Sequence, residues 1–574
     1  MTRPFPKTTR KTVAKAAVLS LLLVSLAALW RPAPSAAQSQ ENEDLIFSTN
    51  PSADARAAEK AVEALEESAP AQESALEPEP AANPETEPVA PEEPSVPEEP
   101  SDDESVKEID VLIDTRHAHD FSDCPLTLED RNYHRIYSFN RAFERLKSRG
   151  VRVERYESDA PLDAELLARC KTLFLNLPSG DKEPFLLSEL VDISNFIKSG
   201  GSAFFIVDHT NCYFHQSRLK PLFNELDIEP QFYGVCDMNQ ALGSGYGWIY
   251  LDKFSPSPVT QNLRQIAFQT GGGVDPRDAV VWSGDKSWRD APNMPVYGEA
   301  DLAYYGNFLP DKGERVGSNG CVLAKEFGRG KIVVVGDQNL FSAFFLQYLD
   351  NYRLWLNSFA WLLDRPELAD PQTYLKNVVS DDAILCWEEL APFARRFGNP
   401  DQEGYYNLYA SLCRRYDPFC VANDDSELGL SANVLLLLNS GSDASQTTLE
   451  VAYKQLAQGK TAIFLDPPED AIQNDELLPA KLLKRLGENG VERAKAPDAP
   501  QSDSNPAPRK YVERIDLSNG GTLILQRGRK SFSNADVPAP EATVLMLQQA
   551  NLNALLQTID SAMSEKRDEN KSNN

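Results

Sequence analysis

Residues that can do chemistry gather after one short apolar run, residues 203–207. A Gly-Gly pair precedes this run, and Asp208, His209, Cys212 and His215 follow it. A short apolar run bounded by glycine predicts a central strand in a sheet that is covered on both faces. Polar residues at the carboxyl end of such a strand lie where open α/β sheets bind ligands. We therefore expect a recognition edge at this point.

The spacing His209-x2-Cys212-x2-His215 is found in metal sites. Imidazole and thiolate ligands suit zinc, so these three residues form a candidate zinc site, and no other cofactor is predicted. The alternative is that they are hydrogen-bonded loop residues. The spacing does not place all three on one helical face, so they converge only if the loop bends.

Other polar residues end strands that we expect to be neighbours. His117 and His119 follow an apolar run at 110–114, and Asp337 follows another at 331–335. Carboxylates from neighbouring strand ends can exchange protons or hold a divalent ion, although such Asp residues also cap helices. No catalytic residue is assigned. The predicted ligand-binding set is His117, His119, Asp208, His209 and Asp337.

The elements that position these residues alternate along the chain. We expect strands at 110–114, 151–156, 171–177, 203–207, 321–327 and 331–335, and helices at 138–149, 163–169, 186–199 and 351–363. This alternation predicts βαβ units, a parallel sheet and helices on both faces. Residues 211–319 show no regular pattern, and we expect irregular loops there. The glycines at 271–273 neither follow a strand nor open a helix as a phosphate loop requires.

The chain contains an internal repeat. Residues 330–342 align without gaps to 521–533, residues 201–208 to 459–466, and residues 173–180 to 434–441, in the same order. Such self-similarity predicts a repeated α/β domain, with copies at 109–365 and 380–565. The second copy contains no histidine, so we expect any ligand site in the first copy.

The amino-terminal region predicts export. A basic start, an apolar segment at 16–30 and a small-x-small site before Gln38 predict a signal peptide at 1–37, with an uncleaved anchor as the alternative. Residues 38–108 are rich in Pro, Glu and Ala and predict a disordered acidic linker, and 566–574 form a polar tail. We expect a periplasmic or cell-surface location.

Charge and cysteine content exclude two classes. The net charge of -29 and the lack of a basic face argue against a nucleic-acid partner. Eight sparse cysteines do not make a disulfide framework, although Cys413 and Cys420 are close enough in sequence for a local bridge.

The first copy resembles the glutamine-amidotransferase-like domains of the DUF4350 type. The residues that carry the resemblance are GGSAFFIVDH at 200–209, SPVTQNL at 257–263, GRGK at 328–331 and GDQNLFS at 336–342. The resemblance implies two flavodoxin-like, doubly wound α/β domains, the second degenerate. Domains of this type mostly lack known chemistry. They also occur in gliding and transport accessory proteins and in an intraflagellar transport subunit.

The resemblance also implies that the amidotransferase nucleophile is absent. In active members a Cys sits in a tight Gly-x-Cys-x-Gly turn after the strand that corresponds to 203–207. Here that position reads Asp208-His209-Thr210, and the second copy reads DPP at 466–468. No histidine follows His215 to act as a base.

We therefore expect a non-catalytic, exported binding or accessory module with a protein partner in the cell envelope. We expect contact with the membrane only through an uncleaved anchor. Two alternatives remain open. One is a structural assembly subunit. The other is a metal-dependent hydrolase or carbohydrate-active enzyme that uses His117, His119, Asp208, His209 and Cys212.

Overall fold

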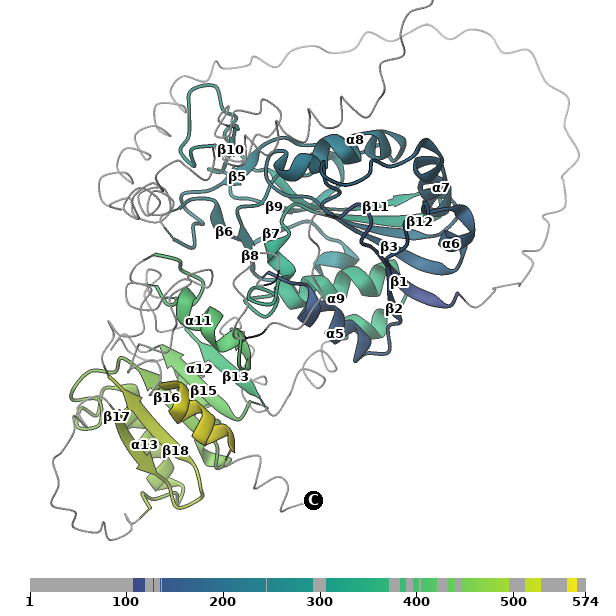
Figure 1. The fold of residues 1–574 in the computed structure, drawn as a ribbon. Helices are drawn as coiled ribbons and strands as arrows, with labels where there is room; N and C mark the ends of the chain where they lie inside the picture. The colour runs from purple at the N-terminus through teal and green to yellow at the C-terminus, as the bar shows by residue number, and fades with distance from the viewer. Residues whose placement is uncertain are drawn as a thin grey trace, which may run out of the picture. The chain divides into compact units, whose positions relative to one another are not determined.

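A mixed eight-stranded sheet forms the first half of the described chain (Figure 1). Its strand order is β2-β1-β3-β4-β12-β11-β9-β7. The strands are β1 (Ile109–Asp114), β2 (Val153–Tyr156), β3 (Cys170–Asn176), β4 (Ser202–Ile206), β7 (Lys253–Phe254), β9 (Ala279–Trp282), β11 (Gly320–Phe327) and β12 (Gly330–Val335).

The first five strands in this order are parallel, and the last three pair antiparallel with their neighbours. The chain steps outward from β1 to β2 and then back across β1 to β3, which is the order of a doubly wound sheet. The predicted α/β class, with a largely parallel sheet, is therefore confirmed.

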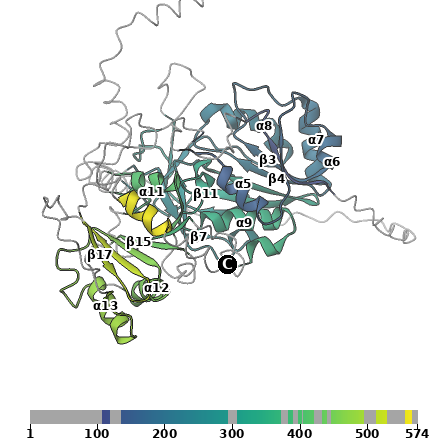
Figure 2. The same ribbon diagram turned by 60° about the horizontal axis from the view of Figure 1, so that its bottom comes forward.

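Helices cover both faces of this sheet (Figures 1 and 2). On one face lie α5 (Asn140–Lys147) and α9 (Asn351–Leu362). On the other lie α6 (Ala164–Ala168), α7 (Leu187–Lys198) and α8 (His215–Glu225).

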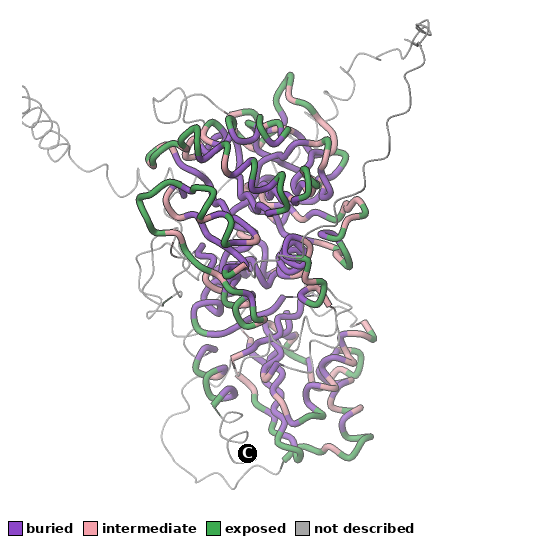
Figure 3. The backbone as a smooth tube through the Cα atoms, turned by 90° about the vertical axis from the view of Figure 1, so that its right-hand side faces the viewer, coloured by how far each residue is buried: buried purple, intermediate pink, exposed green. Residues whose placement is uncertain are grey.

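Strand β4 shows why the run at 203–207 is apolar throughout. Successive side chains of a strand point to opposite faces. Phe204 stacks on Phe359 of α9 with ring centroids 5.2 Å apart, and Phe205 contacts Phe223 of α8 at 5.3 Å. Every residue of β4 is thus buried. Buried segments run through the interior of the tube in Figure 3.

The expectation of irregular loops at 211–319 was wrong. This region contains α8, strands β7 and β9, which widen the main sheet, and two small antiparallel pairs, β6 with β8 and β10 with β5. Strands of two to four residues are too short to show a period, and α8 starts after the left-handed Phe214 and contains Pro221.

The remaining elements of the first half are short. They are the strands β5 (Gly234–Cys236), β6 (Trp248–Leu251), β8 (Ile266–Gln269) and β10 (Trp288–Asp290), and the 3₁₀ turns Cys212–Phe214, Pro258–Thr260, Pro276–Asp278, Asn339–Phe341 and Pro366–Ala369.

A second, six-stranded sheet repeats the order of the first, as β14-β13-β15-β16-β18-β17. The strands that correspond to β1, β3, β4 and β12 are β13, β15, β16 and β18, and the last three of these pairs are the segments paired by the sequence alignment. The pair β12–β11 of the first sheet and the corresponding pair β18–β17 of the second are both antiparallel. The strands are β13 (Ala383–Trp387), β14 (Asp417–Cys420), β15 (Val434–Leu438), β16 (Thr461–Leu465), β17 (Val512–Asp516) and β18 (Thr522–Gln526), with helices α11 (Tyr406–Cys413), α12 (Gln446–Ala457) and α13 (Leu478–Glu488).

The computed structural model describes residues 107–118, 127, 135, 137–243, 245–292, 306–370, 382–388, 396–401, 404–420, 432–438, 445–494, 512–527 and 555–564. The predicted signal peptide, nearly all of the predicted linker, the polar tail and His119 lie outside these ranges. Within them, no helix has the length and apolar character needed to cross a bilayer. All seven cysteines in these ranges are free thiols, so the possible bridge between Cys413 and Cys420 is not formed.

Candidate functional site

Two carboxylates meet at the carboxyl edge of the first sheet, as the sequence predicted. Asp208 lies just beyond β4 and Asp337 just beyond β12, and these two strands are paired in parallel register. The Val207 N–H donates to the Val335 carbonyl at 2.9 Å, so the pairing continues to the edge. Both carboxylates are buried, with exposures of 3% and 0%.

Burial is the main cause of a raised pKa in both carboxylates. It raises the pKa of Asp208 well above its usual range, and the adjacent charge of Asp337 raises it further. The pKa of Asp337 rises to about 7, although N–H groups of Gln269, Asn339 and Leu340 donate to its carboxylate. A buried carboxylate without a cation partner favours its protonated form, so this pair holds protons near neutral pH.

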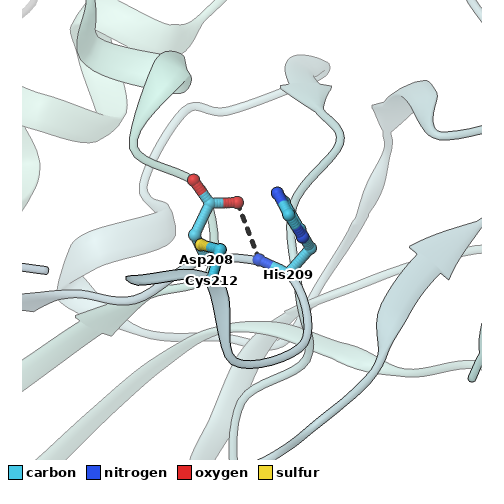
Figure 4. A group of neighbouring side chains, drawn as sticks. All are labelled: Asp208, His209 and Cys212. Atoms are coloured by element: carbon cyan, nitrogen blue, oxygen red, sulfur yellow. Dashed lines mark hydrogen bonds between the residues drawn. The ribbon is translucent and has the colours of Figure 1, made fainter. Parts of the chain in front are cut away.

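Three metal-ligating side chains converge beside this pair. One ligand atom from each of Asp208, His209 and Cys212 lies within 4.8 Å of the others, and all three side chains are buried (Figure 4). The loop bends because Thr210 is left-handed, with φ 52°, and the Cys212 N–H returns to the His209 carbonyl at 3.3 Å. The bent loop that the metal hypothesis required is therefore present.

His215 does not join this group. Its Nε2 accepts from the Asp208 N–H at 3.0 Å, and its Nδ1–H donates to the Cys212 carbonyl at 2.6 Å. Burial lowers the pKa of His215 to about 4, so the ring is neutral and both nitrogens serve the backbone. It fixes the loop, and Asp208 takes its place among the convergent residues.

A glycine turn closes the edge above Asp208 and His209. The Gly272 N–H donates to the Gly336 carbonyl at 2.7 Å. A Cβ added to Gly272 would lie 2.4 Å from the Asp208 carbonyl oxygen and 3.0 Å from the His209 Cα. Close backbone packing thus requires glycine at 272, whereas an added Cβ would meet the Phe268 ring and the Gly336 carbonyl at Gly271, and the Tyr233 ring at Gly273.

A small cavity lies beside His209. Its volume is about 10 Å³, the space of a single water molecule. His209, Thr210, Cys236 and Asp290 contribute to its wall. Burial and the nearby Glu314 raise the pKa of Asp290 to about 7. The cavity does not admit a substrate of ordinary size.

His117 belongs to a different cluster, which corrects the idea of one site shared with His209. Strand β1 pairs with β2 and β3, so β3 separates it from β4 and the two strand ends lie about 10 Å apart. His117 Nδ1 lies 2.8 Å from Asp114 Oδ2, its Nε2 lies 3.1 Å from Arg116 Nη1, and its ring stacks on Phe185.

An open cleft of about 870 Å³ adjoins the His117 cluster, beyond the ends of β1 and β2. Doubly wound sheets bind ligands where the strand order reverses, which here is between β1 and β3, and residues 181–183 after β3 bring one wall of the cleft next to that point. Charges of both signs line it. Its wall comprises Thr115, Arg116, Ala118, Arg155, Glu157, Ser158, Asp159, Asp181, Lys182 and Glu183.

Sequence reasoning missed the partners that organise the His117 cluster. Glu189 is fully buried in α7, and its carboxylate accepts from Arg116 Nη1 at 2.5 Å and from the Leu162 N–H at 2.9 Å. Glu189 stands on the inner face of an otherwise amphipathic helix. The sequence signal that could have revealed this partner was a charged residue, Glu189, at a position of α7 where the helical pattern places apolar residues.

No family model and no curated protein matches the chain. Solved structures match about half of it. The N-terminal domain of mmIFT52 is 15% identical, over 44% of this chain and 97% of that chain, with a TM-score of 0.31. A ThuA-like protein from Bacteroides uniformis is 13% identical, over 47% and 95%, with a TM-score of 0.25.

The cytoplasmic protein STM1381 from Salmonella typhimurium LT2 is 9% identical, over 44% of this chain and 98% of that chain, with a TM-score of 0.25. These values are too low for any property of those proteins to be transferred to this chain.

Proposed function

We propose that the chain is a non-catalytic, exported binding or accessory module of the cell envelope, built on amidotransferase-like, flavodoxin-like α/β domains of the DUF4350 type. Its partner is a protein. The predicted signal peptide and acidic linker are the basis for the location.

The observation that carries this proposal is the closed edge after β4. In an amidotransferase this position must expose a nucleophile to substrate. Here Asp208 and His209 occupy it, and the backbone of Gly272 packs on both. Cys212, the nearest thiol, is 1% exposed.

The protonation states of the neighbouring groups also oppose covalent catalysis. Burial and the nearby Asp208 raise the pKa of Cys212 well above that of an ordinary thiol, whereas a nucleophilic cysteine needs a lowered pKa. His215 lies 3.7 Å from the Cys212 sulfur, but its hydrogen bonds to backbone groups leave it no role as a base.

Recognition is better served by the cleft at the ends of β1 and β2. It is open, and it presents cations such as Arg155 and Lys182 beside anions such as Glu157 and Asp181. A surface of mixed charge suits a polar partner segment of mixed charge, because complementary pairs fix the register of binding.

One observation favours the alternative of a metal-dependent hydrolase, namely the convergence of Asp208, His209 and Cys212. That function also needs a substrate beside the metal. The cavity next to His209 has room for about one water, so the binding function is the better supported.

The test combines activity and location. The purified chain is assayed for ammonia release from glutamine and for hydrolysis of ester and glycoside substrates, beside the variants Cys212→Ala and His209→Ala. We expect no turnover that either substitution abolishes. In cells, we expect the protein outside the cytoplasm. Turnover that is lost with Cys212 or His209, or retention in the cytoplasm, would contradict the proposal.

A further inference from the structure

We propose that Asp208, His209 and Cys212 bind one divalent transition-metal ion, zinc being the best match, in a buried site with three protein ligands. This inference goes beyond the binding function. It assigns the polar edge of β4 a role in holding the fold together at the point where the glycine turn meets the sheet.

The ligand types define the ion. Thiolate, imidazole and carboxylate together are the donors that zinc takes in proteins, whereas calcium and magnesium require oxygen ligands throughout. One thiolate and one carboxylate balance the two positive charges, and the imidazole is neutral. The complex is therefore neutral overall, which matters because an uncompensated charge is costly in a buried position.

Neither carboxylate has another source of positive charge. Within the described part of the chain, Asp208 and Asp337 form no ion pair with a lysine or arginine, and only backbone N–H groups donate to them. A dication at Asp208 would compensate the charge of that carboxylate. Asp337 remains beside the metal, because its two oxygens are already bound to the N–H groups of Gln269 and Asn339 at 2.5 and 2.7 Å.

The distances are compatible with one ion. Tetrahedral ligands at about 2.0–2.3 Å from zinc lie roughly 3.3–3.8 Å from one another. The three ligand atoms are within 4.8 Å of one another, so closure requires side-chain shifts of about 1 Å. The His209 N–H donates to Asp208 Oδ1 at 2.7 Å, which fixes the orientation of that carboxylate beside His209.

A neighbouring hydroxyl can orient the imidazole. Metal-binding histidines commonly donate their second ring N–H to an oxygen, which fixes the tautomer. His209 Nδ1 lies 3.2 Å from Thr210 Oγ1, and donation there would make Nε2 the ligand atom. The cavity of about 10 Å³ beside His209 has the volume for a water as fourth ligand.

The test is metal binding by the full chain. Protein treated with a chelator is titrated with Co²⁺, which gives visible bands in a tetrahedral site and a near-ultraviolet charge-transfer band when a thiolate binds. The matched variants are Cys212→Ser and Cys236→Ser. Both cysteines are buried, and Cys236 lines the cavity but is not one of the convergent residues.

We expect one equivalent of Co²⁺, displaced by Zn²⁺, with a charge-transfer band that Cys212→Ser loses and Cys236→Ser keeps. His209→Ala, which leaves the thiolate, should weaken binding at least tenfold. Failure of the unsubstituted chain to bind a stoichiometric ion overturns the proposal without reliance on any variant. A charge-transfer band that survives Cys212→Ser overturns it as well.

Discussion

Replacement of Gly272 by alanine tests whether the glycine turn seals the edge of β4. The new Cβ would lie 2.4 Å from the Asp208 carbonyl oxygen and 2.9 Å from its carbonyl carbon, and real contacts essentially never fall below 3.0 Å. Both neighbours are backbone atoms that cannot rotate away. The turn must therefore lift from the sheet by about 0.6 Å or more to clear the oxygen.

The expected cost follows from what the lift disrupts. Insertion of a methyl group into a packed region costs about 1–3 kcal/mol, and loss of the bond from the Gly272 N–H to the Gly336 carbonyl costs about 0.5–1.5 kcal/mol. We expect the free energy of unfolding to fall by about 1.5–4.5 kcal/mol.

The assay is equilibrium unfolding in urea, followed by tryptophan fluorescence, with Gly245→Ala as the matched control. A Cβ at Gly245 meets no atom within 4 Å, so that variant should stay within about 0.5 kcal/mol of the unsubstituted protein. Equal stability of the two variants would refute the close packing of the turn on Asp208.

Three further substitutions test other parts of the fold. Gly487 lies in α13, and an added Cβ there would have no atom within 4 Å. Gly487→Ala should therefore raise the free energy of unfolding by about 0.5–1 kcal/mol in the same assay. A decrease would contradict the assigned helix. Phe204→Ala should cost about 3–5 kcal/mol, since the ring is buried against Phe359, and a loss below about 1 kcal/mol would contradict that packing. Burial and Glu314 raise the pKa of Asp290 to about 7, so the folded state holds a proton that the unfolded state releases near pH 4. The free energy of unfolding should therefore fall as pH rises from about 4 to 7. In urea titrations at several pH values, Asp290→Asn should make this pH dependence less steep. An unchanged pH dependence would contradict the raised pKa of Asp290.

Local patterns predicted the elements that carry the site. The runs at 203–207 and 331–335 are apolar throughout because β4 and β12 are covered on both faces, and their shared edge brings Asp208 and Asp337 together. Burial on both faces also made the internal repeat visible. The corresponding central strands of the two sheets must both be apolar along their length, so their sequences resemble each other.

Features that depend on distant residues were not predictable in this way. The order of β1, β3 and β4 is set by crossovers and not by local composition, so His117 was grouped with His209 although β3 lies between them. The hydrogen bonds of His215 to backbone groups depend on the left-handed residues at 210, 213 and 214, and left-handed threonine, tyrosine and phenylalanine are uncommon. The sequence of the glycines at 271–273 does not indicate which part of the chain they pack against, because their contacts are with residues distant in sequence.

The most direct test of the central claim is the reactivity of Cys212 in the native chain. Chelator-treated protein is exposed to iodoacetamide at neutral pH, with and without urea, and the modified cysteines are identified by mass spectrometry. A closed edge with a protonated thiol predicts no alkylation of Cys212 in the folded chain and rapid alkylation once urea unfolds it. Rapid alkylation of Cys212 in the folded chain would show an accessible, activated thiolate and would contradict the account.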